Sequence, residues 1–444
     1  MKYSFSIIFF LTSFINTYGS WPHWRGPNFN GTISDGYKYP LEFDKENSVK
    51  WSYTTPGPSA STPAVNSNRI FLSSIDQRTS SPNGVSKLLA ICLDKKTGKE
   101  VWVDHAGSGY QPGDSHGNEF QLDSKSNYAS PSPVVGKQEV VFFFGNGDLI
   151  CYELDGKVRW RRNLQADFGD FCFQWTFSAS PTIFDGALYL PVLQRDQMVH
   201  GRGIDGADSY LVSFNLLNGQ TNWKISRETE ARMESRESFS SIIPYDDGLL
   251  VAGGDFLTCH SPLDGKELWR WGTWNPGHKQ EWWRLVPSPV VGNGVVLVCA
   301  PKGSPVYAVK IDDKKKIPYK LWDSSSQRNV TSDVPTPLFL NDHFFILSDL
   351  RKTLAKVETV EGKVIWETKL PGKYKWRSSP SGADGKIYLM NHNAHVFVLS
   401  SETGNILNSA KMGDEYDDST RSSIALSSGC LFIRTNKILY CIEE

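Results

Sequence analysis

Short apolar stretches alternate with turn sequences along most of the chain. Examples are 70–72, 141–144, 188–190 and 387–389, each of which follows a short polar turn segment. Runs of this length, bounded by turn residues, are typical of β-strands rather than helices. The pattern therefore predicts an all-β protein that is built from many short strands.

One turn sequence recurs and sets the spacing of these strands. Its fullest form is DKKTGKEVW at 94–102, where a glycine supplies positive φ and a tryptophan lies on the following strand. Shorter copies stand at 155–160, 218–223, 264–269 and 361–366. The segment 321–322 keeps only the strand end, and 403–407 has Leu407 where Trp is expected. A repeat of about fifty residues is typical of a propeller.

Each unit begins with a strand that starts on a Ser-x-Pro-like sequence. The starts lie at 61–63, 132–133, 180–181, 240–242, 288–289, 335–337, 379–380 and 422–424. A second apolar strand follows a short turn, a third leads into the glycine turn, and a fourth carries the tryptophan. Four strands in each of these units predict an eight-bladed β-propeller with four-stranded antiparallel blades.

The two ends of the repeat region each hold part of a unit. The last unit stops at 440–442, after its third strand, whereas the segment near Trp51 is a strand without a unit. Joining them closes the ring and removes unpaired edges, so we expect the N-terminal strand to complete the C-terminal blade. We therefore divide the chain into a strap at 20–47 and one propeller domain at 48–444.

Residues 1–19 have the features of a secretory signal peptide. Lys2 precedes an apolar core from Ile7 to Ile15, and small residues follow it. This core is too short for a stable membrane anchor. We expect cleavage after Gly19 or Ser20 and an exported protein, periplasmic or extracellular, without an integral membrane segment once the signal is removed.

Charge and cysteine content narrow the function classes. A formal net charge of −1 argues against electrostatic binding of nucleic acid. The seven cysteines include no adjacent pair and no CxxC motif. Alignment on the turns places four of them at one shared strand position, which favours buried core thiols over ligands or disulfides: Cys92, Cys151, Cys259 and Cys441. Cys172 lies in an inserted loop, where we also expect it to pack.

The lengths of the connections predict which face carries function. The turns between first and second strands and the glycine turns are short, whereas the remaining connections are long and share the opposite face. Binding residues concentrate on loops held by a rigid scaffold. The informative loops are 103–129, 161–177, 224–237, 270–287 and 408–421, with the insertion 191–209.

Several charged and aromatic residues precede the first strands and are expected at the mouth of the central funnel. By counting back from the strand starts, we place Arg236 and Arg284 at one position and Arg377 and Arg421 at a related one. Near them we expect Tyr128, Trp175, Trp283, Trp376 and Asp333. Together they would suit an anionic or sugar-like ligand. Alternatively, each arginine pairs with an acid such as Glu237, Glu281 or Asp418, and each tryptophan fills space at the top of the ring of blades.

Three other features have structural alternatives. His116, Glu119 and Asp123 could form a metal site, although loop hydrogen bonding accounts for such spacing more simply. The charged run 227–237 is predicted to be a short helix on a solvated rim. His200 and His278 are lone loop histidines without a visible partner.

The repeat resembles that of pyrroloquinoline-quinone (PQQ)-type propellers, over the chain from Trp51 onward. Within them, the chain looks most like exported proteins that open with a Trp-Pro-x-Trp-Arg-Gly-Pro strap (here 21–27), beside the quinoprotein alcohol dehydrogenases and BamB-like scaffolds. The dehydrogenases use adjacent cysteines, a tryptophan beneath the quinone, Ca²⁺ held by Glu, Asn and Asp, and an Asp base. This chain lacks the adjacent cysteines, so no cofactor is predicted, and PQQ with calcium is kept as an alternative.

These observations lead to two hypotheses about the function of the protein. The first is an exported, non-catalytic scaffold, expected to be a monomer, that binds a protein or polysaccharide through its long-loop face. The second is a PQQ-dependent dehydrogenase or a carbohydrate-active enzyme that uses the central funnel. A bound quinone, or a buried pair of titratable groups in the funnel, would favour the second.

Overall fold

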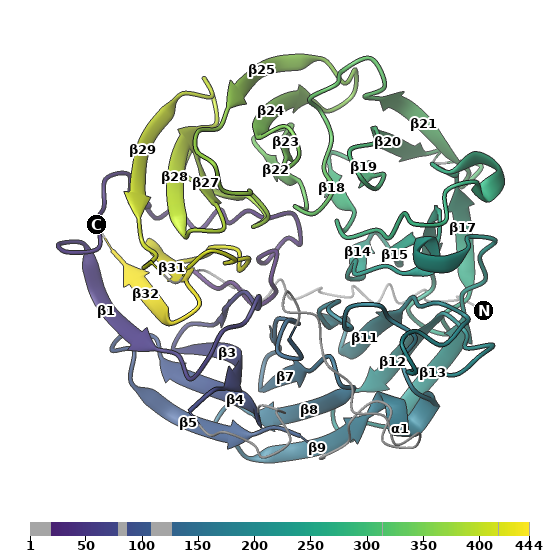
Figure 1. Cartoon of the computed structure of the whole chain (residues 1–444), viewed down its shortest axis with the longest axis horizontal. Coiled ribbons are helices and arrows are strands. Elements are labelled where there is room, and N and C mark those ends of the chain that lie inside the picture. Colours follow the sequence, from purple (N-terminus) through teal and green to yellow (C-terminus); the bar gives the residue numbers. More distant parts are fainter. Residues whose placement is uncertain (1–18, 79–86, 108–126, 313, 416, 444) are drawn as a thin grey trace, which may run out of the picture.

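The computed structural model describes residues 19–78, 87–107, 127–312, 314–415 and 417–443. Eight four-stranded antiparallel sheets surround a central axis (Figure 1). In seven of them the strands follow chain order from the axis outward, and in the eighth β1 (Val49–Thr54) is the outermost strand. The predicted eight-bladed propeller is confirmed.

The blades are numbered in chain order. Blade 1 contains β2 (Ala64–Val65), β3 (Arg69–Asp76), β4 (Lys87–Asp94) and β5 (Glu100–His105). Blade 2 contains β6 (Val134–Val135), β7 (Glu139–Phe143), β8 (Asp148–Glu153) and β9 (Val158–Asn163). Blade 3 contains β10 (Thr182–Phe184), β11 (Ala187–Val192), β12 (Tyr210–Asn215) and β13 (Thr221–Ser226). Blade 4 contains β14 (Ile243–Tyr245), β15 (Gly248–Gly253), β16 (Phe256–His260) and β17 (Glu267–Trp271).

The second half of the ring repeats this arrangement. Blade 5 contains β18 (Val290–Gly292), β19 (Val295–Cys299), β20 (Val306–Ile311) and β21 (Pro318–Asp323). Blade 6 contains β22 (Leu338–Leu340), β23 (His343–Ser348), β24 (Thr353–Glu358) and β25 (Val364–Lys369). Blade 7 contains β26 (Ser381–Ala383), β27 (Lys386–Met390), β28 (His395–Ser400) and β29 (Ile406–Lys411). Blade 8 contains β30 (Ala425–Ser427), β31 (Cys430–Arg434), β32 (Ile438–Ile442) and β1 (Val49–Thr54).

Closure of the ring occurs as the partial units predict. Strand β1 pairs antiparallel with β32, with Trp51 opposite Cys441 and Tyr53 opposite Leu439. In Figure 1 the purple β1 accordingly lies beside the yellow β32. The last blade is therefore made from both ends of the chain, and β32 is not left as an unpaired edge.

Neighbouring blades are joined by the repeated tryptophan and glycine. The tryptophan of one blade covers the turn glycine of the next, and its indole N–H donates to a carbonyl in that turn. Trp160, for example, donates to the Leu216 carbonyl at 2.9 Å, and a Cβ added to Gly219 would lie 2.6 Å from its ring. The other pairs are Trp51 with Gly98, Trp102 with Gly156, Trp223 with Gly265, Trp322 with Gly362 and Trp366 with Gly404.

One detail of the repeat alignment is corrected. Each tryptophan lies opposite a fixed residue of the third strand, as Trp102 lies opposite Cys92. In blade 7 the corresponding residue is Asn408, which lies opposite Val398, and not Leu407. Asn408 donates to the Leu41 carbonyl of the strap at 2.9 Å, so an amide replaces the indole there.

The cysteine prediction is confirmed. Cys92, Cys151, Cys259 and Cys441 each lie opposite a repeat tryptophan, and all seven cysteines are buried and free. Cys172 contacts the backbone of Ile204 through its sulfur, at 3.3 Å from the nitrogen and 3.4 Å from the oxygen. It therefore packs the inserted loop against the body of the propeller.

A ring of hydroxyl groups joins the innermost strands around the axis. In each blade a backbone N–H donates to a Ser or Thr hydroxyl of the next blade at 2.9–3.1 Å. The hydroxyl ring consists of Thr62, Ser132, Ser180, Ser241, Ser288, Thr336, Ser379 and Ser423. Because Ser423 N donates back to Thr62, the chain of hydrogen bonds is closed.

The N-terminal strap crosses one end of the central channel. Its backbone bonds to Val65, Val135, Phe339 and Gly382 on the innermost strands of blades 1, 2, 6 and 7. Each of these residues is three positions beyond the hydroxyl ring, which is about 10 Å along a strand. In Figure 1 the dark purple segment accordingly reaches the centre of the ring.

The strap is anchored by a fully buried arginine. Arg25 donates to the carbonyls of Pro337 and Pro380, both at 2.7 Å, and its guanidinium lies 5.5 Å from the ring centre of Trp24. Burial lowers the pKa of Arg25 to about 9. The strap therefore crosses the channel on the side of the short turns.

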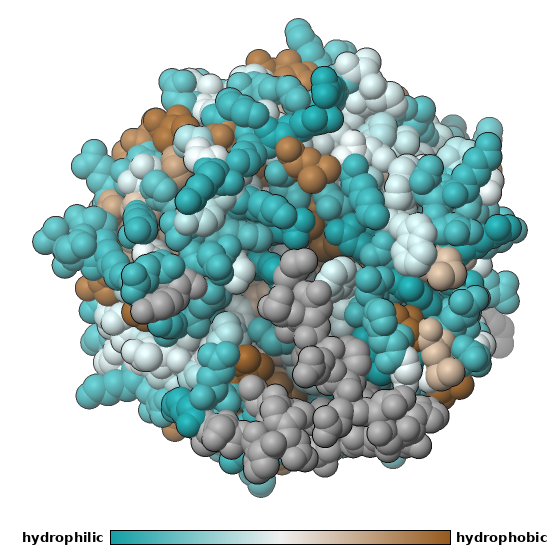
Figure 2. Space-filling view, viewed as in Figure 1, coloured by the Kyte–Doolittle hydropathy of each residue, from teal (hydrophilic) through white to brown (hydrophobic). Residues whose placement is uncertain are grey.

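The opposite face carries the long connections, including α1 (Leu164–Phe168), η2 (Met233–Arg236) and η3 (Pro276–His278). The face of the ring shown in Figure 2 is mainly hydrophilic, with hydrophobic residues scattered over it. Within the described ranges, no helix is both long and apolar enough to cross a membrane.

Candidate functional site: the central funnel

A cavity of about 930 Å³ lies at the axis, and we call it the funnel. Its wall includes every member of the hydroxyl ring except Ser288. Trp24 of the strap also lines it, so the wall reaches from the long-loop face down to the strap. A volume of this size lies within the usual range of small-molecule sites.

A second ring of residues lines the funnel above the hydroxyls. It is formed by the residue two positions before each ring hydroxyl, and we call it the rim ring: Ala60, Ser130, Ser178, Phe239, Val286, Val334, Arg377 and Arg421. Blades 1–3 contribute small residues, blades 4–6 contribute apolar residues, and blades 7 and 8 contribute arginines. A position that the fold repeats eight times therefore has a small, an apolar and a cationic sector.

The cationic sector is held together by one histidine. The backbone N–H of His392 donates to the Lys375 carbonyl, and its own carbonyl accepts from Thr420, both at 2.9 Å. His392 thereby ties the loop that carries Arg377 to the loop that carries Arg421. Burial, with Arg421, Arg377 and Lys375 nearby, lowers the pKa of His392 to about 4, so its side chain is neutral at pH 7.

Some of the buried polar atoms without a partner belong to residues of the funnel wall. Among the described residues, Trp24 Nε1, Arg377 Nε and His392 Nε2 are buried and make no hydrogen bond. Arg377 does lie 3.7 Å from Asp349, a buried carboxylate whose pKa burial raises. Buried polar groups usually find partners, so these atoms of the wall are open to a ligand or water.

Of the sequence candidates, Arg284, Arg377, Arg421 and Trp175 line the funnel. Arg284 is paired, because its guanidinium contacts both carboxylate oxygens of Asp333 at 3.2 and 3.4 Å. Asp333 is therefore close to the funnel but engaged. The pairing that the alternative interpretation expected for arginines exists here, with a different acid from those it named.

The structure changes the alignment of Arg236. Ser241, not Ser240, belongs to the hydroxyl ring, and Ser238 forms a parallel bridge with Leu285. Glu237 is consequently the equivalent of Arg284, and Arg236 is displaced by one position. Its guanidinium lies 3.3 Å from Asp196 in the insertion and does not line the funnel.

Three aromatic candidates lie in hydrophobic clusters between blades. Trp376 is completely buried, with its ring 5.1 Å from that of Phe397. Tyr128 packs in the cluster between blades 1 and 2, and Trp283 packs in the cluster between blades 4 and 5. None of the three is part of the funnel wall as described. For Trp376 and Tyr128, burial matches the alternative in which aromatic residues fill the ring.

The charged run at 227–237 differs from the prediction of a solvated rim. Only Met233–Arg236 is helical, as a single 3₁₀ turn, and Arg227, Glu234 and Glu237 are buried. Arg227 bonds to the carbonyls of Gly253 and Phe256, and burial lowers its pKa to about 9. The prediction was wrong because a charged sequence pattern does not reveal buried partners elsewhere in the chain.

The structure places His278, but it does not describe the candidate metal group. His278 is held between two carboxylates, with Nδ1 2.8 Å from Asp255 and Nε2 2.9 Å from Glu230, so it is not alone. The candidates His116, Glu119 and Asp123 lie outside the described residues, as does the signal segment 1–18. In the part of the chain that is described, no cluster of three potential metal ligands is found.

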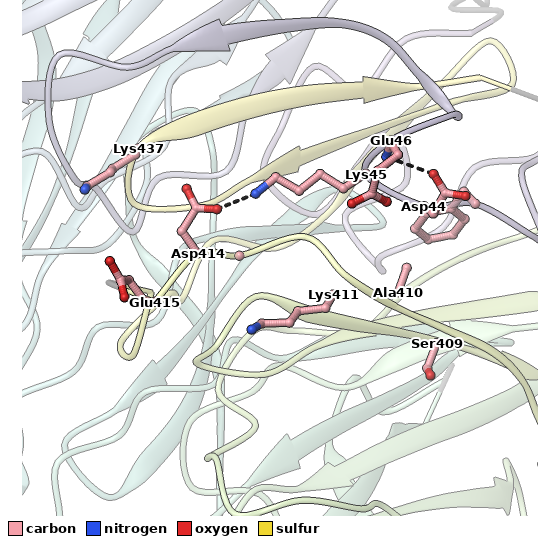
Figure 3. Close-up of a pocket in the computed structure, with 11 residues that line it drawn as sticks. Asp44, Lys45, Glu46, Ser409, Ala410, Lys411, Asp414, Glu415 and Lys437 are labelled. Atoms are coloured by element: carbon pink, nitrogen blue, oxygen red, sulfur yellow. Dashed lines mark hydrogen bonds and ion pairs between the residues drawn. The ribbon is translucent and has the colours of Figure 1, made fainter.

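A second cavity, of about 770 Å³, lies at the outer edge where the strap meets blade 7 (Figure 3). Lysines and acids face one another across it, and Lys45 pairs with Asp414. Its other charged lining residues are Asp44, Glu46, Lys411, Glu415 and Lys437. Because three lysines and four carboxylates are mixed around the wall, this cavity shows no strong preference for a ligand of either charge.

The funnel residues fit a calcium–quinone cofactor poorly. Calcium needs several oxygen ligands, usually including carboxylates. Asp418 is the only carboxylate among the described residues of the funnel wall. The arginines and Trp24 could contact an anionic ring, but the donor set around them does not match a calcium site, and we derive no step through such a cofactor.

The sequence reasoning missed Trp24, His392, Lys373, Lys375 and Tyr374, which all line the funnel. A signal for the last three was present, because they immediately precede Arg377. Trp24 could not be assigned, since the strap has no counterpart among the repeats.

Eight docked blades around a closed funnel define a β-propeller with quinoprotein-type repeats. A family model described as outer membrane protein assembly factor BamB matches residues 41–171, 89–320 and 319–439. The chain therefore belongs to this family. No curated protein sequence matches the chain.

Solved structures share the fold at low sequence identity. BamB from Moraxella catarrhalis is 12% identical, with a TM-score of 0.58 over 89% of this chain and 99% of that one. A europium-containing methanol dehydrogenase is 11% identical, with a TM-score of 0.59 over 89% and 86%. Quinohemoprotein alcohol dehydrogenase from Comamonas testosteroni is 12% identical, with a TM-score of 0.59 over 96% and 81%. Identities this low establish the fold alone.

Proposed function

We propose that this protein is an exported, monomeric, non-catalytic propeller that binds a partner through its long-loop face, with the funnel as the recognition site. The observation that carries the proposal is the sector of Arg377 and Arg421 around the buried imidazole of His392. These groups can hold an anion by charge-assisted hydrogen bonds. We favour a polysaccharide over a protein, because the contacts converge in a deep cavity and not on an apolar patch.

Composition of the funnel supports binding over catalysis. General acid–base or nucleophilic chemistry needs paired titratable groups within reach of one substrate. Among the described wall residues, Asp418 and His392 are the acid and imidazole present, and the low pKa of His392 makes it a poor base near pH 7. The remaining polar groups are hydroxyls and cations, which bind and orient.

The function is tested by screening acidic and neutral glycans against the mature protein and by titrating it with PQQ and calcium. We expect acidic glycans to bind, and to remain chemically unchanged on prolonged incubation. Tight binding of PQQ together with dye-coupled alcohol oxidation would overturn the proposal in favour of a dehydrogenase. Turnover of a bound glycan would overturn its non-catalytic part.

Export is tested separately. The full-length chain produced in a secreting host is expected to reach the exported fraction with its N-terminus at Ser20 or Trp21. A protein that keeps residues 1–19 in that fraction would contradict the signal-peptide prediction, and sedimentation of the mature form at twice the monomer mass would contradict the monomer.

A further inference from the structure

The funnel has an opening at one end and a floor at the other. The rim ring lies two residues, about 7 Å, above the hydroxyl ring, and the strap bonds to the innermost strands about 10 Å below it. Trp24 lines the cavity from the strap side, and the buried guanidinium of Arg25 supports its ring. A ligand that enters from the long-loop face therefore meets the strap at the far end of the cavity.

The wall offers hydrogen-bond donors at two depths. Each ring hydroxyl accepts from a backbone N–H, which leaves its own O–H to donate, and Trp24 adds a buried indole N–H without a partner among the described residues. Higher up, Arg377 and Arg421 supply the positive charge. The aromatic side chains of the wall are Trp24, Trp175 and Tyr374, with Phe239, Val286 and Val334 on its apolar side.

We propose that the funnel recognises the terminal sugar of an acidic oligosaccharide, whose carboxylate lies against Arg377 and Arg421 and whose hydroxyls face the hydroxyl ring and Trp24. This inference rests on the proposed function and names its ligand class. A sugar with an acidic group presents the matching features: one negative charge, many oxygen acceptors and apolar C–H faces that stack on aromatic rings.

Other anions match the wall less well. Phosphate sites are typically built from convergent backbone N–H groups at glycine-rich loops or helix N-termini. Here one backbone N–H of each blade already donates within the hydroxyl ring, so it is not available to an anion. An acidic peptide would need partners for its own N–H groups, and Asp418 is the only carboxylate acceptor among the described wall residues.

The strap across the far end of the funnel implies that the protein recognises the end of an oligosaccharide chain. An internal sugar of a polymer has neighbours on both sides, and both would need a path out of the cavity. The strap crosses the other end between blades 1 and 2 and blades 6 and 7, and we take it to block the second path. The binding stoichiometry should therefore be one protein for each accessible chain end, whatever the chain length.

The ligand class is tested by calorimetric titration of the mature protein with three oligosaccharide series of matched length. These are oligogalacturonates, neutral galactose oligomers and sulfated galactose oligomers. We expect the galacturonates to bind at least tenfold more tightly than the neutral series. Binding by the sulfated series alone would assign a sulfate and overturn the carboxylate, and equal binding of all three would overturn charge recognition.

Chain-end recognition is tested by stoichiometry as the galacturonate grows from four to twelve sugars. We expect a constant number of bound proteins per chain. A number that rises with length would overturn recognition of the end while leaving the proposed function intact. Absence of binding by any of the glycans would instead overturn the proposed function.

Substitutions of single wall residues test which side chains contact the galacturonate. Arg377→Gln and Arg421→Gln are each expected to weaken galacturonate binding tenfold or more. Arg328→Gln, an exposed arginine of the connection between blades 5 and 6, is the matched control and should bind as the parent does. Trp24→Phe keeps the floor but removes the indole donor, so weaker binding with unchanged stoichiometry is expected. Parent-like affinity in both arginine variants, with folding confirmed by circular dichroism, would overturn the assignment.

Discussion

The contact between Trp160 and Gly219 gives a sharp test of what joins the blades. Gly219 has a φ of +71°, and a Cβ placed on it would lie 2.6 Å from the Trp160 ring. Gly186 provides a control with nearly the same backbone, at a φ of +76°, but with open space where a Cβ would lie. Gly219→Ala and Gly186→Ala therefore share the backbone strain and differ in the clash.

The difference in unfolding free energy can be bracketed. Alanine in the left-handed region costs about 1–2 kcal/mol, and about 0.4–1 kcal/mol of this is offset because the unfolded chain loses freedom. Gly186→Ala should therefore destabilise by about 1 kcal/mol. Gly219→Ala must also displace Trp160, which is mostly buried, and overpacking adds about 1–3 kcal/mol.

The assay is equilibrium unfolding in urea, or calorimetric Tm if unfolding is irreversible. We expect Gly219→Ala to be clearly less stable than Gly186→Ala. Removing the ring with Trp160→Leu should relieve the clash, so the double variant should be less destabilised than the sum of the single variants. Two results together would refute the idea that this contact joins the blades. They are equal stability of the two alanine variants, and a double variant whose loss of stability equals the sum of the losses in Gly219→Ala and Trp160→Leu.

Three further outcomes are expected. Arg195→Met should destabilise by about 3–5 kcal/mol, because it leaves the fully buried Glu237 without its ion pair, and adding Glu237→Leu should recover much of the loss in urea unfolding. Burial lowers the pKa of His23 to about 3 and of His260 to about 4, so the unfolded state binds more protons below pH 6.5. For each of these two histidines, the free energy of unfolding should therefore fall by about 1.4 kcal/mol per pH unit between pH 6 and pH 4.5. A free energy of unfolding that does not change over this range would contradict burial of the neutral imidazoles. Arg25→Met leaves two carbonyls without donors and should lower the Tm, with increased proteolysis of the strap as the second measurement.

The fold could be predicted because its determinants are local and repeated. The glycine turn with its tryptophan fixes the third and fourth strands of each blade, and the half-units at the two ends require closure between β1 and β32. Errors arose where a repeat was imperfect. Blade 7 has Asn408 in place of the tryptophan, and adjacent serines at 240 and 241 allowed a shift of one residue.

The site could be predicted only in part, because it depends on contacts distant in sequence. Arg377 and Arg421 were found from their distance to the strand starts, which the fold preserves. Trp24 enters the funnel through bonds between the strap and blades more than three hundred residues away, which no local pattern encodes. His392 was missed because it lies after a second strand, where the repeat gives no reason to expect a wall residue.

The differences among the blades locate function more precisely than their similarities do. The hydroxyl ring and the tryptophan contacts recur because every blade must join its neighbours, so they report on the fold. At the rim ring the side chains differ from blade to blade, and the residues separate into small, apolar and cationic sectors, although Arg377 also lies 3.7 Å from Asp349 of blade 6. Exchanging Arg377 for the valine found at the same position in blade 6 should therefore alter ligand binding far more than stability. If stability fell as much as binding, the rim ring would belong to the scaffold, and the funnel assignment would lose its basis.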